Sequence, residues 1–495
     1  MADVVYYFEA KEAFEIVRSV FLTPLMDEPS TSSFASLDSC CEDLAYQGTS
    51  TRFASLLSLP CRFKEQKPDS DQADSILKSI PEGLLEELLL ADDEQLSEFR
   101  HLAIDVLETL LPSCNATTLE EFSQLIPALV HRLKIANNDI DELNSISKCI
   151  ISLCFDGDSA STEFVQETAD VLSSYCVRNP KKFPFDDLLQ RLTECMLTLQ
   201  HHGENYELVS KSYSWPKDIR TLVKAFLKTR TEMLTDNMRI QVFKLAKEVL
   251  ETLGTDWFAP DVSLLVLLVH LVVVQMRMCL DKPETISTES LAVCYFILES
   301  AIRCAEESSF VEDVAATQIA NSIHEAALYS IQYLVEAKEQ KEELSADVEN
   351  VIYRFVCCIL AIGGAQMLPE SLMEKCSSHM LEIFERSVTE KDFKKARLLL
   401  PVLDTLPQLP DNLVTLLVDL VVSQYPGDEW RETAEDVCDS LESLCSRVDY
   451  YSKETLRDAV CKIKNVLPKC RWLLLLKCAS RIACIVQCEV ESGCE

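Results

Sequence analysis

Glycine is scarce in this chain, with 9 residues among 495. A chain so poor in glycine cannot supply many tight strand turns or phosphate-binding loops. Neither Gly-x-Gly-x-x-Gly nor Gly-Lys-Ser/Thr occurs, so the usual nucleotide-binding signatures are absent. We therefore expect no nucleotide cofactor and little β-structure.

Positive charge is also in short supply. The chain carries 46 Lys and Arg against 81 Asp and Glu, for a net charge of −35. Nucleic acid and anionic lipid are poor partners for such a surface. The acidity can serve solubility alone, by keeping a long helical array from sticking to itself, or it can steer basic segments of partner proteins towards the surface.

Clusters that could carry chemistry are missing. Only 7 histidines are present, and none of the 22 cysteines forms a Cys-x-x-Cys motif. His324-Glu325 begins like a zinc-protease helix, but Leu328 stands where the second histidine would be. There is no Gly-x-Ser-x-Gly elbow and no set of kinase motifs. We expect no enzymatic activity, no metal and no cofactor.

The cysteines are spread along helical segments, and the first residues lack a basic stretch followed by an apolar run. The N-terminal residues argue against a secretory signal. The spread of the cysteines favours reduced, mostly buried thiols. We therefore expect a cytoplasmic protein.

What the chain does contain is helical periodicity. Residues 1–48 end in a Ser- and Asp-rich linker, and another polar break is expected from Lys64 to Ala73. Apolar stretches of helical period then recur, with helix pairs about 40 residues apart. This pattern predicts an all-α fold, an armadillo/HEAT-like α-solenoid of stacked helix pairs over residues 49–495. The expected helices are 82–90, 94–112, 118–134, 140–155, 161–178, 184–200, 216–229, 236–253, 261–280, 288–304, 312–337, 345–362, 369–386, 411–424, 432–447, 453–466 and 470–490.

The most distinctive helix is the one expected at 261–280. Asp261 is a good N-cap residue, and apolar residues then cover every face of the helix. The unbroken apolar run from Leu264 to Val269 stops at His270, which is too short for a membrane span of roughly 20 residues. We expect a helix covered by other helices, with His270 hydrogen-bonded in the core and no integral membrane association. By this interpretation Leu267→Asp should unfold or aggregate the protein, because it buries an unpaired charge.

The segment around this helix also resembles a known protein family. Gly254-Thr255-Asp256-Trp257, followed by an apolar helix that ends in Met276-Arg277-Met278, resembles the neurochondrin family of helical-repeat proteins. Order and spacing agree over roughly 50–400. The positions that carry the resemblance are Phe53, Gly254, Asp256, Trp257, Met276, Arg277, Met278, Tyr295, Glu325 and Tyr333. For Trp257 we favour packing at the corner between helices, under the helix that follows, over a role as a binding hot spot.

The resemblance implies a non-enzymatic cytosolic scaffold for other proteins. It further implies roles in neurons: neurite outgrowth, synaptic plasticity and negative regulation of calcium/calmodulin-dependent kinase II phosphorylation, with neuronal projections as a location. Partners would be basic protein segments or a kinase. The alternative is a HEAT-type transport or trafficking adaptor. Nuclear-import proteins of this class carry Trp-x-x-x-Asn arrays, which the four tryptophans here do not form.

Overall fold

The computed structural model describes residues 67–420 and 430–445, with short gaps, and the single residues 59 and 63. The chain divides into two compact units, Met1–Trp257 and Phe258–Glu495. Every regular element in the described part is a helix, so the predicted all-α class is confirmed. The segment 1–48, Phe53 and the helices expected at 453–466 and 470–490 lie outside the described residues.

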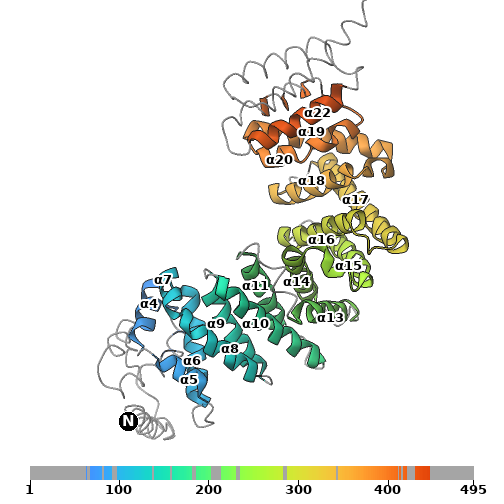
Figure 1. Ribbon diagram of the computed structural model, residues 1–495. Helices are drawn as coiled ribbons and strands as arrows, with labels where there is room; N and C mark the ends of the chain where they lie inside the picture. Colours follow the sequence, from blue (N-terminus) through green and yellow to red (C-terminus); the bar gives the residue numbers. More distant parts are fainter. Residues whose placement is uncertain are drawn as a thin grey trace, which may run out of the picture. The chain divides into compact units, whose positions relative to one another are not determined.

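Unit 1 is built from two rows of helices. One row contains α6, α9, α11 and α14, and the other contains α5, α8, α10 and α13, with each helix packed against the next member of its row (Figure 1). Helices also pair across the rows, as α8 does with α9 and α10 with α11. The elements are α4 Ser70–Ser79, α5 Leu84–Leu90, α6 Ser97–Leu110, η2 Leu111–Ser113, α7 Ala116–Phe122, η3 Ser123–Leu125, α8 Ile126–Ile135, α9 Ile140–Cys154, α10 Ser159–Arg178, α11 Asp186–His201, α13 Trp215–Leu227 and α14 Asp236–Leu253, followed by η7 Thr255–Phe258.

Unit 2 repeats this plan. The helices α15, α17 and α19 form one row, and α16, α18 and η10 form the other, with α22 packed on η10. The elements are α15 Val262–Leu280, α16 Thr288–Glu307, α17 Asp313–Gln340, α18 Ala346–Ala361, η9 Gly364–Met367, α19 Glu370–Glu390, α20 Phe393–Arg397, η10 Leu400–Thr405 and α22 Trp430–Cys445. Stacked helix pairs in both units make the fold an armadillo/HEAT-like α-solenoid.

Side-chain caps begin many of these helices. Thr235 accepts a hydrogen bond from the backbone N–H of Met238 at 3.2 Å, and Ser345 accepts one from Val348 at 3.3 Å. Each cap satisfies a backbone donor that the first turn of a helix leaves without a partner. At the other end of α14, Gly254 has a φ of +73°, which ends the helix in a conformation that a side chain would disfavour.

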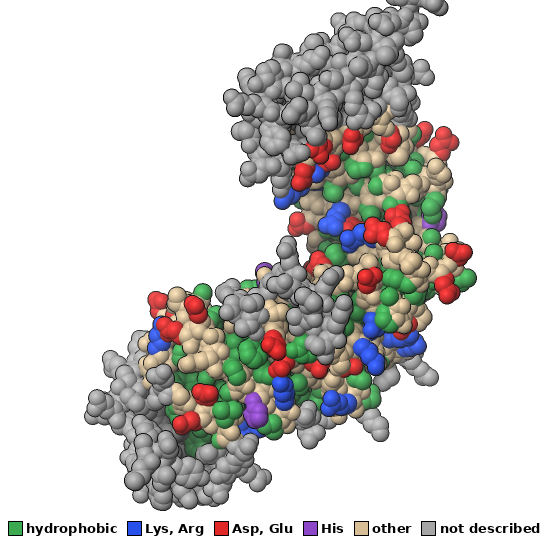
Figure 2. Space-filling view, in the orientation of Figure 1, with side chains coloured by type: hydrophobic (Ala, Val, Ile, Leu, Met, Phe, Trp, Pro, Cys, Tyr) green, Lys and Arg blue, Asp and Glu red, His purple; other side chains and the backbone are tan. Residues whose placement is uncertain are grey.

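Polar pairs also join neighbouring helices within a row. In unit 1, Lys148 of α9 lies 3.1 Å from Glu108 of α6, and Lys134 of α8 lies 2.8 Å from Glu167 of α10. In unit 2, Lys338 of α17 lies 2.6 Å from Glu382 of α19. On the face seen in Figure 2, acidic side chains are spread among basic and hydrophobic ones instead of forming one patch. Some of the acidic side chains on each row are therefore already paired with lysines of a neighbouring helix.

Two predicted boundaries were wrong. The polar break expected from Lys64 to Ala73 contains the start of α4, because Asp69 and Gln72 form a capping box that starts a helix despite the polar composition. The single helix expected at 118–134 is α7, η3 and α8, since Pro127 can occupy only the first turn of a new helix.

The helix α15 is less covered than its composition predicts. Leu264 and Leu268 are fully buried, but Leu267 is half-buried, His270 is exposed, and Val274 is 43% exposed. Because α16 and α17 pack against one side of the helix, the expectation of a covered helix with a core His270 was wrong, and Leu267 is a poorer probe of the core than Leu268.

By length and composition alone α15 could cross a membrane, and 44% of its most apolar window is buried inside the protein. Core helices pass the same test, and the packing of α15 on α16 and α17 gives it a core role in unit 2. Asp261 holds the N-cap position as predicted, although its side chain accepts from Ser263 Oγ at 2.7 Å instead of from the helix backbone.

Candidate functional site

The corner after α14 is tied to the first turns of α13. The Trp257 side chain is 3% exposed, and its Nε1–H donates to the carbonyl of Pro216 at 2.9 Å. The Arg220 guanidinium donates to the carbonyl of Trp257 itself. Asp256 is exposed beside it. A buried indole with its N–H satisfied fits a packing role better than a surface hot spot.

Met276 and Tyr295 meet in the core of unit 2. The Tyr295 hydroxyl and Ser330 Oγ are 2.7 Å apart, and Ser330 Oγ lies 3.5 Å from the sulfur of Met276. The Tyr295 ring also stacks on Phe355, with centroids 4.6 Å apart. Burial raises the pKa of Tyr295, so the phenol stays neutral. This cluster joins α15, α16, α17 and α18, and it is structural.

Arg277 and Glu325 lie together on the surface. Their side chains pair between α15 and α17, and the guanidinium carbon of Arg277 lies 5.0 Å from the centroid of the Tyr329 ring. Glu325 forms an ion pair with Arg277. We therefore assign Glu325 a structural role and not a role in a metal site with His324. Met278 and Tyr333 are half-buried. The ten predicted positions therefore do not converge on one site, and Phe53 lies outside the described part.

Few other groups among the described residues could bind a metal or act as a nucleophile. No group of three or more His, Cys, Asp or Glu side chains that could hold a metal is found among the described residues. The cysteines described there form no disulfide, and most are buried. Burial raises the pKa of both Cys176 and Cys376 to about 12, so these thiols are protonated at neutral pH and poor nucleophiles.

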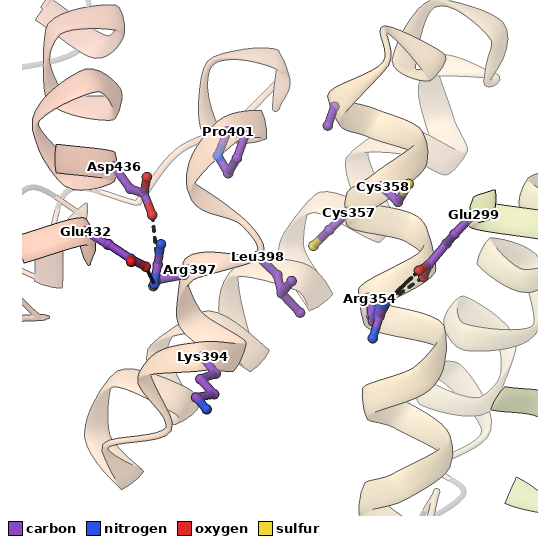
Figure 3. Close-up of a pocket in the computed structure, with 11 residues that line it drawn as sticks. Glu299, Arg354, Cys357, Cys358, Lys394, Arg397, Leu398, Pro401, Glu432 and Asp436 are labelled. Atoms are coloured by element: carbon purple, nitrogen blue, oxygen red, sulfur yellow. Dashed lines mark hydrogen bonds and ion pairs between the residues drawn. The ribbon is translucent and has the colours of Figure 1, made fainter. Parts of the chain in front are cut away.

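A hollow of about 530 Å³ in unit 2, lined by described residues, is a candidate site (Figure 3). It lies between α16 and α18 on one side and α20, η10 and α22 on the other. Its lining residues are Glu299, Arg354, Cys357, Cys358, Ala361, Lys394, Arg397, Leu398, Pro401, Glu432 and Asp436. None of them was predicted from the sequence to be a site residue. The only available signal was helical spacing, such as Glu432 with Asp436, and this spacing is common on any solvated helix face.

Three ion pairs, centred on two arginines, form facing walls of this hollow. Arg354 of α18 holds Glu299 of α16 through two nitrogens, with Nη2 at 2.7 Å and Nε at 3.2 Å from Oε2. On the other wall, Arg397 of α20 reaches α22, with Nε 2.8 Å from Asp436 Oδ2 and Nη1 3.1 Å from Glu432 Oε2. In Figure 3 the Leu398 side chain lies between the two walls. The hollow offers three cations and three carboxylates, an arrangement suited to binding and without a nucleophile–base pair.

A second polar cluster surrounds His379 on α19. The imidazole is 12% exposed, with Nε2 3.7 Å from Glu349 Oε1 and Nδ1 3.9 Å from Glu382 Oε2. Neither ring nitrogen has a hydrogen-bond partner in the described structure. Burial first, and then the charge of Lys338, lower the pKa of His379 in spite of the two carboxylates. The histidine is therefore held neutral in the folded chain.

These observations define a class before they define a family. Stacked helix pairs and a polar hollow without a catalytic constellation are features of an armadillo-like helical-repeat protein. The model of the neurochondrin family matches residues 175–423, and this chain belongs to the neurochondrin family. The cationic residues of the hollow lie inside that range, whereas Glu432 and Asp436 lie beyond it.

Individual relatives are more distant. Neurochondrin of Gallus gallus is 28% identical over 162 residues, which cover 31% of this chain and 22% of the relative. Neurochondrin of Xenopus laevis is 27% identical over 141 residues, 26% of this chain and 20% of the relative. The matched part thus spans about a fifth of the length of these curated relatives.

Two solved structures align with this chain at low sequence identity. A structure from work on a phosphorylation switch that controls the interaction between cadherin and beta-catenin aligns with a TM-score of 0.43 at 11% identity, over 91% of this chain and 94% of that one. A circular tandem repeat protein aligns with a TM-score of 0.21 at 13% identity, over 92% of this chain and 97% of that one.

The lowered pKa of His379 predicts an acid-sensitive contribution to stability. Below about pH 6.5, the ordinary histidine pKa, the unfolded chain binds a proton that the folded chain takes up only at lower pH. The urea midpoint should therefore fall between about pH 7 and about pH 5.5, and His379→Gln should reduce that fall. His270→Gln, at an exposed histidine, is the matched control and should behave like the natural chain. Equal falls in all three proteins would contradict the assignment.

Proposed function

We propose that this chain is a non-enzymatic cytoplasmic scaffold that binds other proteins through the outer surfaces of its helix rows. The observation that carries the proposal is the packing of each helix against the next member of its row, as for α6, α9, α11 and α14. Side chains of successive helices thereby share one surface, which is how repeat proteins present extended binding faces. Membership of the neurochondrin family supports this role.

Basic segments are the partners that the charge favours. The net charge of −35 generates a negative field, and the acidic side chains seen in Figure 2 are distributed over the visible face. Such a field raises the rate at which a basic partner meets the surface more than it raises the final affinity. We therefore assign specificity to local sites and the rate of encounter to the overall charge.

The finer role follows from the family likeness. Within this proposal the chain acts in neuronal projections, in neurite outgrowth and synaptic plasticity, by lowering phosphorylation of calcium/calmodulin-dependent kinase II. Residues 49–495 would form the binding domain, with 1–48 as a segment and linker before it. The modest identity to the curated relatives, 28% and 27%, is why these roles need a direct assay.

The charge proposal predicts a strong dependence of association on salt. A partner captured from cytosol by the full chain, identified by mass spectrometry and purified, should associate several-fold more slowly at about 0.15 M than at about 0.01 M salt, since the Debye length shortens from about 30 Å to about 8 Å. The dissociation rate should change far less. An association rate unaffected by salt, together with loss of binding in Val274→Asp or Val314→Asp, would assign recognition to exposed apolar residues instead.

The kinase role predicts an effect in a purified system. The isolated chain, added to calcium/calmodulin-dependent kinase II with calmodulin and ATP, should lower phosphorylation of the kinase in proportion to the amount bound. Bovine serum albumin at equal concentration controls for crowding. An unchanged level of phosphorylation, with binding to other cytosolic partners intact, would remove this role and favour the transport or trafficking adaptor.

A further inference from the structure

The two walls of the hollow in unit 2 present opposite charges to solvent. On the α18 wall the cation points outward, because the Arg354 side chain is 58% exposed while its partner Glu299 is 11% exposed. On the α22 wall the anions point outward, because Glu432 is 70% and Asp436 41% exposed while Arg397 is 25% exposed. Each pair is thus oriented so that the hollow has one positive and one negative side.

Both sides keep bonding capacity. Arg397 uses only Oε2 of Glu432 and only Oδ2 of Asp436, which leaves the second oxygen of each carboxylate to accept from a ligand. Glu299 accepts from Nε and Nη2 of Arg354, and the remainder of this exposed guanidinium can donate to a ligand. The walls can therefore bind a second pair of charges without breaking the pairs already formed.

The space between the walls is neutral. Leu398 is 36% exposed, and Pro401 is also exposed. Burial raises the pKa of the half-buried Cys358 thiol to about 11, so the thiol carries no charge at neutral pH. An apolar side chain is the natural occupant of this strip, because it would remove Leu398 and Pro401 from water.

We propose that the hollow binds a short segment of a partner protein in which an acidic and a basic side chain flank an apolar one. The acidic side chain pairs with Arg354, the basic one pairs with Glu432 and Asp436, and the apolar one packs on Leu398. This proposal rests on the scaffold function and names the kind of sequence that one of its sites selects.

Charge complementarity separates this ligand from simpler ones. A uniformly basic segment would bring like charge to Arg354, and a phosphate or nucleic acid strand would bring like charge to Glu432 and Asp436. A ligand that carries both signs can meet the opposite charge on each wall and so avoids both repulsions. A volume of about 530 Å³ accommodates the few side chains that this requires.

The test is selection from a random library of nine-residue peptides displayed on phage, with the full chain as bait. The selected peptides should share an acidic and a basic residue separated by an apolar one. A synthetic peptide of that sequence should bind about tenfold more weakly to Arg354→Glu, and also to the double variant Glu432→Lys with Asp436→Lys, which corresponds to about 1.4 kcal/mol. Reversing the acidic residue of the peptide to Lys should restore its binding to Arg354→Glu.

Arg277→Glu is the matched control, because Arg277 is also a half-exposed arginine paired with a glutamate on the next helix of its row. Arg354→Gln, which removes the charge without reversing it, guards against misfolding of Arg354→Glu and should also weaken binding. Selected peptides without the mixed-charge pattern, or equal binding to hollow and control variants, would overturn the proposal. If salt-sensitive partner binding persisted in that case, the scaffold function would stand, whereas loss of partner binding as well would remove both.

Discussion

Burial of apolar side chains between successive helices of a row is the interaction on which the rest of this structure depends. In unit 2, α15 packs against α16 and α17 with Leu264 and Leu268 fully buried, and the stacking of Tyr295 on Phe355 extends that core to α18. No helix pair of this kind can bury its apolar face alone, so each one is stable only as part of the stack. The helix faces that remain outside are the surfaces available for partners.

The fold was largely predictable because periodicity and caps are local. The expected helix 236–253 coincides with α14, since Thr235 and Gly254 mark its two ends in the sequence itself. The burial of individual side chains was harder to predict from the sequence, because it depends on which helices pack against each face. Apolar residues all round α15 predicted a covered helix, yet its packing leaves His270 exposed. Likewise Asp69 and Gln72 appear as a polar break in the sequence, although together they start a helix.

The candidate site could not be predicted in the same way. The described positions that carry the family resemblance include a packed corner at Trp257, a core cluster around Tyr295 and a surface pair formed by Arg277 and Glu325. The hollow instead draws Glu299, Arg354, Arg397 and Asp436 from four helices, separated by 55, 43 and 39 positions in sequence. Charged residues at such separations carry no shared pattern, and only the stacking of helices sets which side of each ion pair faces solvent. A strongly acidic chain can thus contain a local site that balances both charges.

The most direct test of stacking by nearest-neighbour packing is hydrogen exchange measured by mass spectrometry on Leu268→Ala, with Leu267→Ala as the control. Removing the buried Leu268 side chain should cost about 3 kcal/mol locally, and the half-buried Leu267 should cost less. Because each helix depends on its neighbours, exchange in Leu268→Ala should quicken in α15, α16 and α17 and stay unchanged in α8, α9 and α10. Equal acceleration in all of these helices would show one cooperative core and contradict the account.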